Sequence, residues 1–287
     1  MIPAGEIMRN KILLALGILF STGLHSAQAF EDAIIRIGVG EQITCANTTN
    51  NTRCWGRNPD QLSSEPGDLL AVGNAHYCIS GKSGVKCGGQ RMTAPPSNLT
   101  DVYELRAMGN HTCALSAKGI QCWGSGWNTV SFQANPKDPF YSFVFGDAFF
   151  CFMKKSGVTC TDAFGKTYRG IPSKIAPALQ LVAGNDHVCA LTLNREVKCW
   201  GSAATDVPPN LKDVNFLASG GSCVCASSAK GVECWGSRRY ACRPPSDLRD
   251  VLSMSIGTEH GCAVTRLGTR CWGGSYYKEA EIPAELF

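Results

Sequence analysis

The sequence predicts an all-β fold, a closed seven-bladed β-propeller formed by a single domain. Three observations support this prediction. Pairs of cysteines recur seven times along the 287 residues. A hairpin pattern lies between the two cysteines of each pair. The last residues, Ile282 to Phe287, repeat a phrase that opens earlier units, and the chain from Phe30 to Gly38 reads as its continuation.

The repeat is marked by Cys-Trp-Gly, which stands in five copies at Cys54, Cys122, Cys199, Cys234 and Cys271. Degenerate copies at Cys87 and Cys160 fill the two gaps, so that successive copies are 33 to 39 residues apart. Self-similarity at such a period is typical of repeat architectures. About four strands of five residues fit in one unit, as in a propeller blade.

Each of these cysteines follows a partner by nine residues, or by ten in the fifth repeat. Placing Cys113 opposite Cys122 pairs Leu115 with Ile120 and leaves Ala117-Lys118 at the tip of a hairpin. Directly opposed residues have Cα atoms about 4.5–5.5 Å apart, a distance that a disulfide accepts. The spacing predicts one disulfide in each repeat: Cys45–Cys54, Cys78–Cys87, Cys113–Cys122, Cys151–Cys160, Cys189–Cys199, Cys225–Cys234 and Cys262–Cys271.

Cys223 and Cys242 remain outside this pattern. Because an even number of cysteines remains, we expect an eighth disulfide that ties the sixth repeat to the loop after it. Two unpaired thiols are the alternative. The extra residue between Cys189 and Cys199 predicts a bulge or a longer turn. Zinc binding is the weaker interpretation of these cysteines because the period does not match paired CxxC knuckles. No metal is expected.

A proline-rich phrase precedes several hairpins, as in Pro208 to Val214 and Pro244 to Val251. Each unit therefore reads as loop, proline-rich turn, strand and hairpin. Because the chain ends in this phrase, we expect its N- and C-terminal segments to pair in one blade and close the ring. A linear solenoid would need capping repeats instead.

The N-terminus has the features of a secretory signal peptide. Arg9 and Lys11 precede an apolar run from Ile12 to Leu24, and Ala27-Gln28-Ala29 offers a small-x-small cleavage site. Removal of residues 1–29 leaves a single domain, residues 30–287, with no membrane span; an uncleaved anchor is the alternative. All sixteen cysteines lie in that part, as expected in an oxidising compartment. We expect a bacterial protein that is periplasmic or extracellular.

The phrases GNHTCALSAKGIQCWGSG (Gly109 to Gly126) and HVCALTLNREVKCWG resemble the regulator-of-chromosome-condensation repeat in its cysteine-rich bacterial form. The resemblance covers the whole exported chain and implies a seven-bladed propeller with a binding role. Similar repeats build a nucleotide-exchange factor, a secreted β-lactamase inhibitor and the ectodomain of crinkly-type receptor kinases. Their partners have nothing in common. The Gly-Gln-Leu-Gly stretch typical after Trp-Gly is nearly lost here; only Asp60-Gln61-Leu62 matches it in part.

Catalytic and cofactor motifs are not evident, and neither catalytic residues nor a cofactor is predicted. Gly81-Lys82-Ser83 sits at a hairpin tip with no helix after it, so it is not a phosphate loop. Four histidines stand two residues before a first hairpin cysteine: His76, His111, His187 and His260. Their regular position favours a structural hydrogen bond within or between blades. A histidine ring that binds a metal or an anion is the alternative.

Residues that do not repeat are better candidates for function. The segments after each second cysteine are expected on one face, and they contain aromatic and basic side chains of the kinds enriched at binding hot spots. The partner-binding candidates are Arg57, Arg91, Trp127, Phe132, Tyr168, Arg169, Arg238, Arg239, Tyr240, Tyr276, Tyr277 and Lys278. Ordinary loop residues resting on the propeller rim are the alternative interpretation.

The sequence thus predicts an exported, monomeric, non-catalytic propeller that recognises a protein partner. A lectin-like or peptidoglycan-binding propeller and an enzyme are the alternatives. The formal charge of +4, from 27 basic and 23 acidic residues, gives no support to nucleic-acid binding.

Overall fold

The computed structural model describes residues 34–57, 67–90, 94–125, 130–168, 170–236 and 240–286. Asp32–Phe287 form one compact unit. The predicted signal peptide, residues 1–29, lies outside the described residues. Within the described part of the chain, none of the helices has the length and hydrophobicity that a membrane crossing requires.

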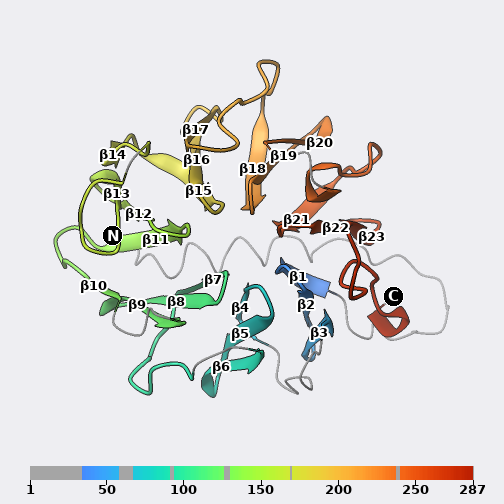
Figure 1. Ribbon diagram of the computed structural model, residues 1–287, viewed down its shortest axis with the longest axis horizontal. Coiled ribbons are helices and arrows are strands. Elements are labelled where there is room, and N and C mark those ends of the chain that lie inside the picture. The colour runs from blue at the N-terminus through green and yellow to red at the C-terminus, as the bar shows by residue number, and fades with distance from the viewer. Residues whose placement is uncertain are drawn as a thin grey trace, which may run out of the picture. The chain divides into compact units, whose positions relative to one another are not determined.

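Seven antiparallel sheets follow one another along the chain (Figure 1). The first three contain β1 (Ile34–Val39), β2 (Ile43–Thr48) and β3 (Thr52–Gly56); β4 (Leu69–Val72), β5 (His76–Gly81) and β6 (Gly84–Gly89); and β7 (Glu104–Met108), β8 (His111–Ser116), β9 (Gly119–Gly124) and β10 (Ser131–Gln133). The fourth contains β11 (Phe140–Phe145), β12 (Phe150–Lys154), β13 (Gly157–Thr161) and β14 (Lys174–Ile175). The last three contain β15 (Ala178–Ala183), β16 (His187–Thr192) and β17 (Val197–Gly201); β18 (Val214–Gly220), β19 (Cys223–Ser228) and β20 (Gly231–Gly236); and β21 (Val251–Ile256), β22 (His260–Thr265) and β23 (Gly268–Gly273).

Each sheet is one blade, and its first strand is the innermost. The inner strands contact one another in the order β1, β4, β7, β11, β15, β18 and β21, and β21 and β22 contact β1 again. Residues from all seven inner strands line one central channel. This arrangement is the predicted all-β seven-bladed propeller.

Among the described residues, five blades have three strands where four were expected. In four of these blades a proline-rich turn follows the third strand, and proline offers no N–H to a sheet ladder. In this turn a leucine N–H bonds the carbonyl of the proline three residues before it, as from Leu211 to Pro208 at 3.2 Å and from Leu248 to Pro245 at 3.1 Å. In the described part of the chain a fourth strand forms in the third blade, as β10, and in the fourth blade, as β14.

The C-terminal segment forms the same proline turn and contacts the first blade by packing. Leu286 N–H bonds the Pro283 carbonyl at 3.0 Å, within a short 3₁₀ turn, Ala284–Leu286. Leu286 and Ile282 belong to a hydrophobic cluster with Ile37 and Val39 of β1. Among the described residues the two end segments meet through these side-chain contacts, and the first sheet contains β1, β2 and β3; residues 30–33 and 287, on which the expected strand pairing also depends, lie outside the described part.

Each blade contains one disulfide across its outer hairpin, as predicted. The two cysteines of a pair are directly opposed in the ladder, as Cys113 and Cys122 are, with Cα atoms 4.0 Å apart. The structure also joins Cys223 to Cys242, with Cα atoms 5.7 Å apart, so that all sixteen cysteines are paired. The extra residue before Cys199 is absorbed in a longer turn, where Arg195 has a φ of 61°.

The core lies between neighbouring blades. Each hydrophobic cluster joins residues of adjacent sheets, such as Val144 and Phe149 of the fourth blade with Leu181 and Val188 of the fifth. Tryptophans of the Cys-Trp-Gly motif add polar links between blades. The indole N–H of Trp235 bonds the Ala204 carbonyl at 3.0 Å, and that of Trp272 bonds the Ala241 carbonyl at 2.9 Å. These tryptophans therefore hold the loop that follows the preceding blade.

Candidate functional site

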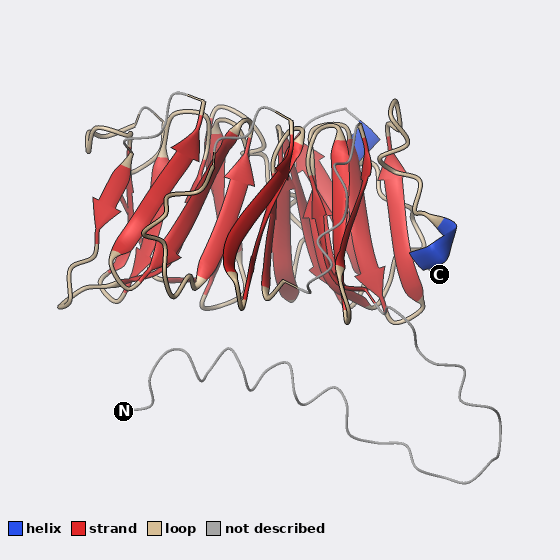
Figure 2. Cartoon of the chain, turned by 90° about the horizontal axis from the view of Figure 1, so that it is seen from below, coloured by secondary structure: helices blue, strands red, loops and turns tan. Residues whose placement is uncertain are grey.

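The third strands of the blades end on one side of the disc, which we call the long-loop face; Figure 2 shows the strands running between the two faces. In five blades the first N–H after the third strand bonds a carbonyl in the turn between the first and second strands of the same blade. The pairs are Arg57 with Gln42, Gln90 with Ala75, Ser125 with Asn110, Ser202 with Asp186, and Gly274 with Glu259. Because these turns also surround one mouth of the channel, the long loops and that mouth share a face.

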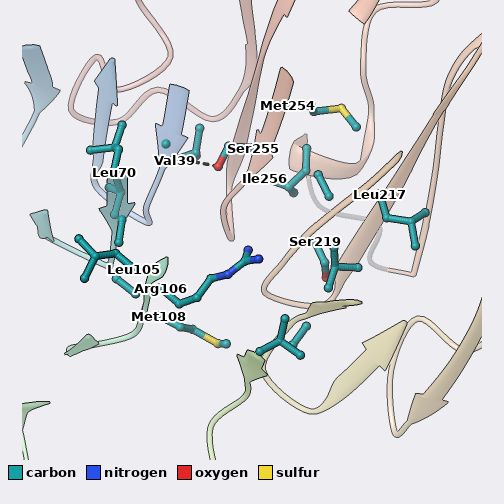
Figure 3. A pocket seen from close by; sticks show the side chains of 18 of the residues that line it. Val39, Leu70, Leu105, Arg106, Met108, Leu217, Ser219, Met254, Ser255 and Ile256 are labelled. Carbon is teal, nitrogen blue, oxygen red and sulfur yellow. Dashed lines mark hydrogen bonds between the residues drawn. The ribbon is translucent and has the colours of Figure 1, made fainter. Parts of the chain in front are cut away.

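The channel contains two adjoining cavities. The inner cavity, about 280 Å³, is lined by inner-strand residues that include Leu105, Leu217 and Met254. Figure 3 shows Arg106 extending into this space. Its guanidinium is held by Glu104, with Nε 2.7 Å from Oε1. This cation is therefore already partnered inside the protein, and the accessible wall of the cavity is more polar than apolar although most lining side chains are aliphatic.

The second cavity, about 250 Å³, lies at the mouth on the long-loop face. Its polar lining residues are Glu41, Asn74, Asp147, Asn185, Ser219 and Thr258. Partial burial and the charge of a neighbouring aspartate raise the pKa of Asp147 above its usual value. No basic residue lines this cavity in the part of the chain that the structure describes. The mouth is therefore weakly acidic.

Backbone hydrogen bonds between blades fix the shape of this mouth. The Gln42 N–H bonds the Asn74 carbonyl at 2.8 Å, and the Asn74 N–H bonds the Gly109 carbonyl at 2.8 Å. On the other side, the Asn185 N–H bonds the Gly221 carbonyl at 2.8 Å. The turns therefore connect blade to blade and give the long-loop face a rigid base.

Three of the repeated histidines bind the next blade, as the structural interpretation predicted. His76 Nε2 lies 2.8 Å from Thr112 Oγ1, and His187 Nε2 lies 2.9 Å from Ser219 Oγ. His260 Nε2 lies 2.6 Å from Thr44 Oγ1 and so joins the last blade to the first. Burial lowers the pKa of each of these three imidazoles to about 4.

The hydroxyl partners define the histidine tautomer. Thr44 Oγ1 donates its proton to the Glu279 carbonyl at 2.7 Å, so it accepts a hydrogen bond from His260 Nε2–H. Ser219 Oγ likewise donates to the Cys223 carbonyl at 2.9 Å. These histidines are neutral donors that serve the packing of the blades.

Five of the predicted partner-binding residues lie outside the described residues: Arg91, Trp127, Arg169, Arg238 and Arg239. Two others are used inside the protein. Phe132 lies in β10, with its ring 4.6 Å from that of Phe152, and the Tyr168 ring lies 5.4 Å from that of Phe149. Both are half-buried because a fourth strand or a folded-back loop presses them against the blade.

The structure brings three of the predicted residues together at the junction of the last and first blades. The Arg57 guanidinium lies 5.1 Å from the centre of the Tyr277 ring, and the Tyr276 and Tyr277 rings meet edge to face at 5.0 Å. Arg57 Nη1 also donates to Gln42 Oε1 at 2.9 Å. Tyr276 is 88% exposed, so this cluster presents an aromatic ring to solvent. The adjacent Lys278 is exposed as well.

Glu279 holds the loop that carries this cluster. The residue is buried, and its carboxylate accepts the backbone N–H groups of Tyr276 at 3.2 Å and Tyr277 at 2.6 Å. Its carbonyl accepts the Thr44 hydroxyl and the Trp55 indole N–H, both from the first blade. Glu279 was not among the residues predicted from the sequence, where it is one of two glutamates, with Glu281, that follow the tyrosines in this loop.

Tyr240 forms a second exposed aromatic site on this face. It begins a short 3₁₀ turn, Tyr240–Cys242, and is 63% exposed, with the Arg243 guanidinium 6.0 Å from its ring centre. The disulfide to Cys223 and the bond from Trp272 to the Ala241 carbonyl fix this turn. Exposed aromatic rings on fixed loops suit recognition, because little conformational freedom remains to be lost on binding.

Comparison with known proteins agrees with this architecture. Residues 179–203, the fifth blade, match the model of the regulator of chromosome condensation (RCC1) repeat. No curated protein matches the chain. The chain is therefore a β-propeller that contains an RCC1-type repeat, as the resemblance of its sequence implied.

Solved structures with the same fold include two receptor ectodomains. The CRINKLY WD40 ectodomain of the receptor kinase ACR4 from Arabidopsis thaliana is 21% identical, with a TM-score of 0.69 over 88% of this chain and 100% of that chain. The ectodomain of the receptor kinase CR4 from Physcomitrella patens is 22% identical, with a TM-score of 0.67 over 84% and 74% of the two chains. Prp20p from Saccharomyces cerevisiae, whose binding to Gsp1p and histones has been described, is 17% identical, with a TM-score of 0.55 over 87% and 74%.

Proposed function

We propose that this chain is an exported, non-catalytic binding propeller that recognises a protein partner through its long-loop face. The observation that carries the proposal is the cluster of Arg57, Tyr276 and Tyr277. Hydrogen bonds inside the protein hold this cluster in place, and its Tyr276 ring is exposed to solvent. Tyrosine and arginine are enriched at interface hot spots because they combine apolar area with polar groups.

Support for export comes from the disulfides. Eight disulfides persist only where the surroundings are oxidising, and two of the similar structures are receptor ectodomains. The signal peptide proposed for residues 1–29 agrees with this location. Residues 30–287 then form the exported protein.

Support for binding without catalysis comes from the channel. An active site needs acid, base or nucleophilic groups that converge on one point. Arg106 is paired with Glu104, and three histidines are neutral and bonded to the next blade. The similar solved structures include propellers that bind proteins, such as Prp20p with Gsp1p.

The proposal is tested by crosslinking capture with residues 30–287 as bait, followed by mass spectrometry. We expect one protein in stoichiometric amount, and at least tenfold less of it with the double variant Tyr240→Ser and Tyr276→Ser. The matched control is Leu267→Ser, which changes a 95% exposed side chain on the opposite face. Recovery of glycans alone, or capture that the tyrosine variant leaves intact, contradicts the proposal and favours the lectin-like alternative.

A further inference from the structure

An unusual set of exposed apolar side chains recurs at one position of the inner strands. Ile35, Tyr141, Leu179 and Leu252 are each the second residue of such a strand, and Tyr103 stands at the equivalent place before β7. Their exposed fractions are 49, 46, 49, 59 and 55%. Apolar residues at one position in five of seven blades form a ring, which we call the apolar ring.

A β-bulge turns these side chains outward. In β1, Ile34 pairs with Thr48 and Arg36 with Asn47, so that Ile35 is an extra residue without a partner in the ladder. The same shift in register occurs around Tyr141, Leu179 and Leu252. Bulges re-aim side chains. Here they direct apolar groups to solvent, although the fold does not require an apolar residue there, since the sixth blade has the exposed Asn215 at the equivalent bulge.

The apolar ring lies on the face opposite the long loops. The inner strands begin there, and they run toward the turns at the long-loop mouth. The turns between second and third strands lie on the same side as the apolar ring, because the second strand runs antiparallel to the first. We call this side the hairpin-tip face. Figure 2 shows the strands spanning the disc between its two faces.

The hairpin tips add exposed leucines and a basic border. Leu193 is 63% exposed and Leu267 is 95% exposed, each in the turn between the second and third strands of its blade. Six blades carry basic residues at their tips: Lys82, Lys118, Lys154, Lys155, Arg195, Lys230 and Arg266. Acidic residues share this side: Glu196 lies at one of these turns, Asp138 bonds Ser156 at another, and the exposed residues Asp68, Asp101, Asp213 and Asp250 come just before inner strands. The hairpin-tip face therefore combines an apolar ring, two projecting leucines and hairpin tips at which basic residues outnumber acidic ones.

We infer that the hairpin-tip face docks on an anionic lipid surface. A lipid surface accepts apolar side chains that are dispersed over a disc, whereas a protein partner must match each of them. Exposed leucines next to lysine and arginine bind such a surface by insertion of the apolar groups and attraction of the basic ones. Tyr103 and Tyr141 suit the headgroup level, where tyrosine is enriched. Docking in this way leaves the long-loop face open.

The test uses residues 30–287, which contain the compact unit Asp32–Phe287, and vesicles with or without about 30% phosphatidylglycerol in phosphatidylcholine, at about 0.1 M salt. We expect co-sedimentation with the anionic vesicles and little with the neutral ones. The double variant Leu193→Ser and Leu267→Ser should weaken binding at least tenfold. The triple variant Lys118→Gln, Lys230→Gln and Arg266→Gln should weaken it similarly and reduce its dependence on salt.

Tyr276→Ser is the matched control. It removes a side chain about as exposed as the two leucines, but from the long-loop face, and it should leave lipid binding unchanged. All the substituted side chains at the tips are exposed, so the variants keep the fold, which intact disulfides and circular dichroism verify. Absence of binding, equal binding to neutral vesicles, or insensitivity to the leucine variant overturns the inference. Dimer formation through this face, or capture of an acidic protein there, also overturns it. None of these results affects the capture experiment on the long-loop face.

Discussion

Acidification should destabilise the propeller through its buried histidines. Burial holds the pKa of His76, His187 and His260 at about 4, whereas the unfolded chain has the ordinary value of about 6.5. Below pH 6.5 the unfolded state therefore binds more protons than the folded state. Stability is fully present above that pH and is lost as the pH falls toward 4. At pH 5 each histidine costs about 2 kcal/mol, so that the three together cost about 6 kcal/mol.

The assay is urea unfolding of residues 30–287, with disulfides intact, at pH 7, 6 and 5. The predicted loss is large beside the 5–15 kcal/mol that is typical of folded domains. Exposed carboxylates titrate mostly below this range. His260→Gln keeps an N–H donor for Thr44 and removes the ionisable group, so it should reduce the loss between pH 7 and 5 by about a third. A free energy of unfolding that is constant from pH 7 to 5, or a pH dependence that the variant leaves unchanged, refutes the reasoning.

Three further predictions concern the junctions between blades. Gly257→Ala places a Cβ 2.0 Å from a carbonyl oxygen of the first blade and should lower the melting temperature by several degrees. Gly268→Ala is the comparison, because its Cβ meets no atom within 4 Å. It should lower the free energy of unfolding only by the strain of its positive φ, about 1 kcal/mol. The double variant Cys223→Ala and Cys242→Ala opens a 19-residue loop and should cost about 3 kcal/mol in urea unfolding, with the other seven disulfides intact by mass spectrometry. Glu279→Ala removes the acceptor of two tyrosine N–H groups and should speed hydrogen exchange in residues 274–281 at least tenfold; unchanged exchange contradicts the anchoring role.

The blade count and the hairpin disulfides could be predicted because they depend on spacing alone. A nine-residue interval between cysteines has one simple solution in a two-stranded ladder, and Cys113 with Cys122 shows it. The role of the histidines followed from their regular position. Their partners, Thr112, Ser219 and Thr44, belong to the next blade and could not be selected without the three-dimensional packing.

The remaining features depend on contacts between distant segments. Phe132 reads as an exposed loop residue, but the length of its loop lets it return to the blade as β10. The bulges that expose Tyr141 and Leu179 cannot be recognised from the sequence of one strand, although the repeat has an apolar residue at this position in five blades. The cluster of Arg57 with Tyr277 needs the last blade to meet the first, which only the folded chain shows.

Hydrogen exchange of residues 30–287, alone and with the captured partner, tests the central claim most directly. A protein bound to the long-loop face should slow exchange in residues 274–281 and 240–243 and leave the tips at Lys118 and Lys230 unchanged. Slowed exchange at the tips or along the inner strands, with the tyrosine loops unaffected, would contradict the account.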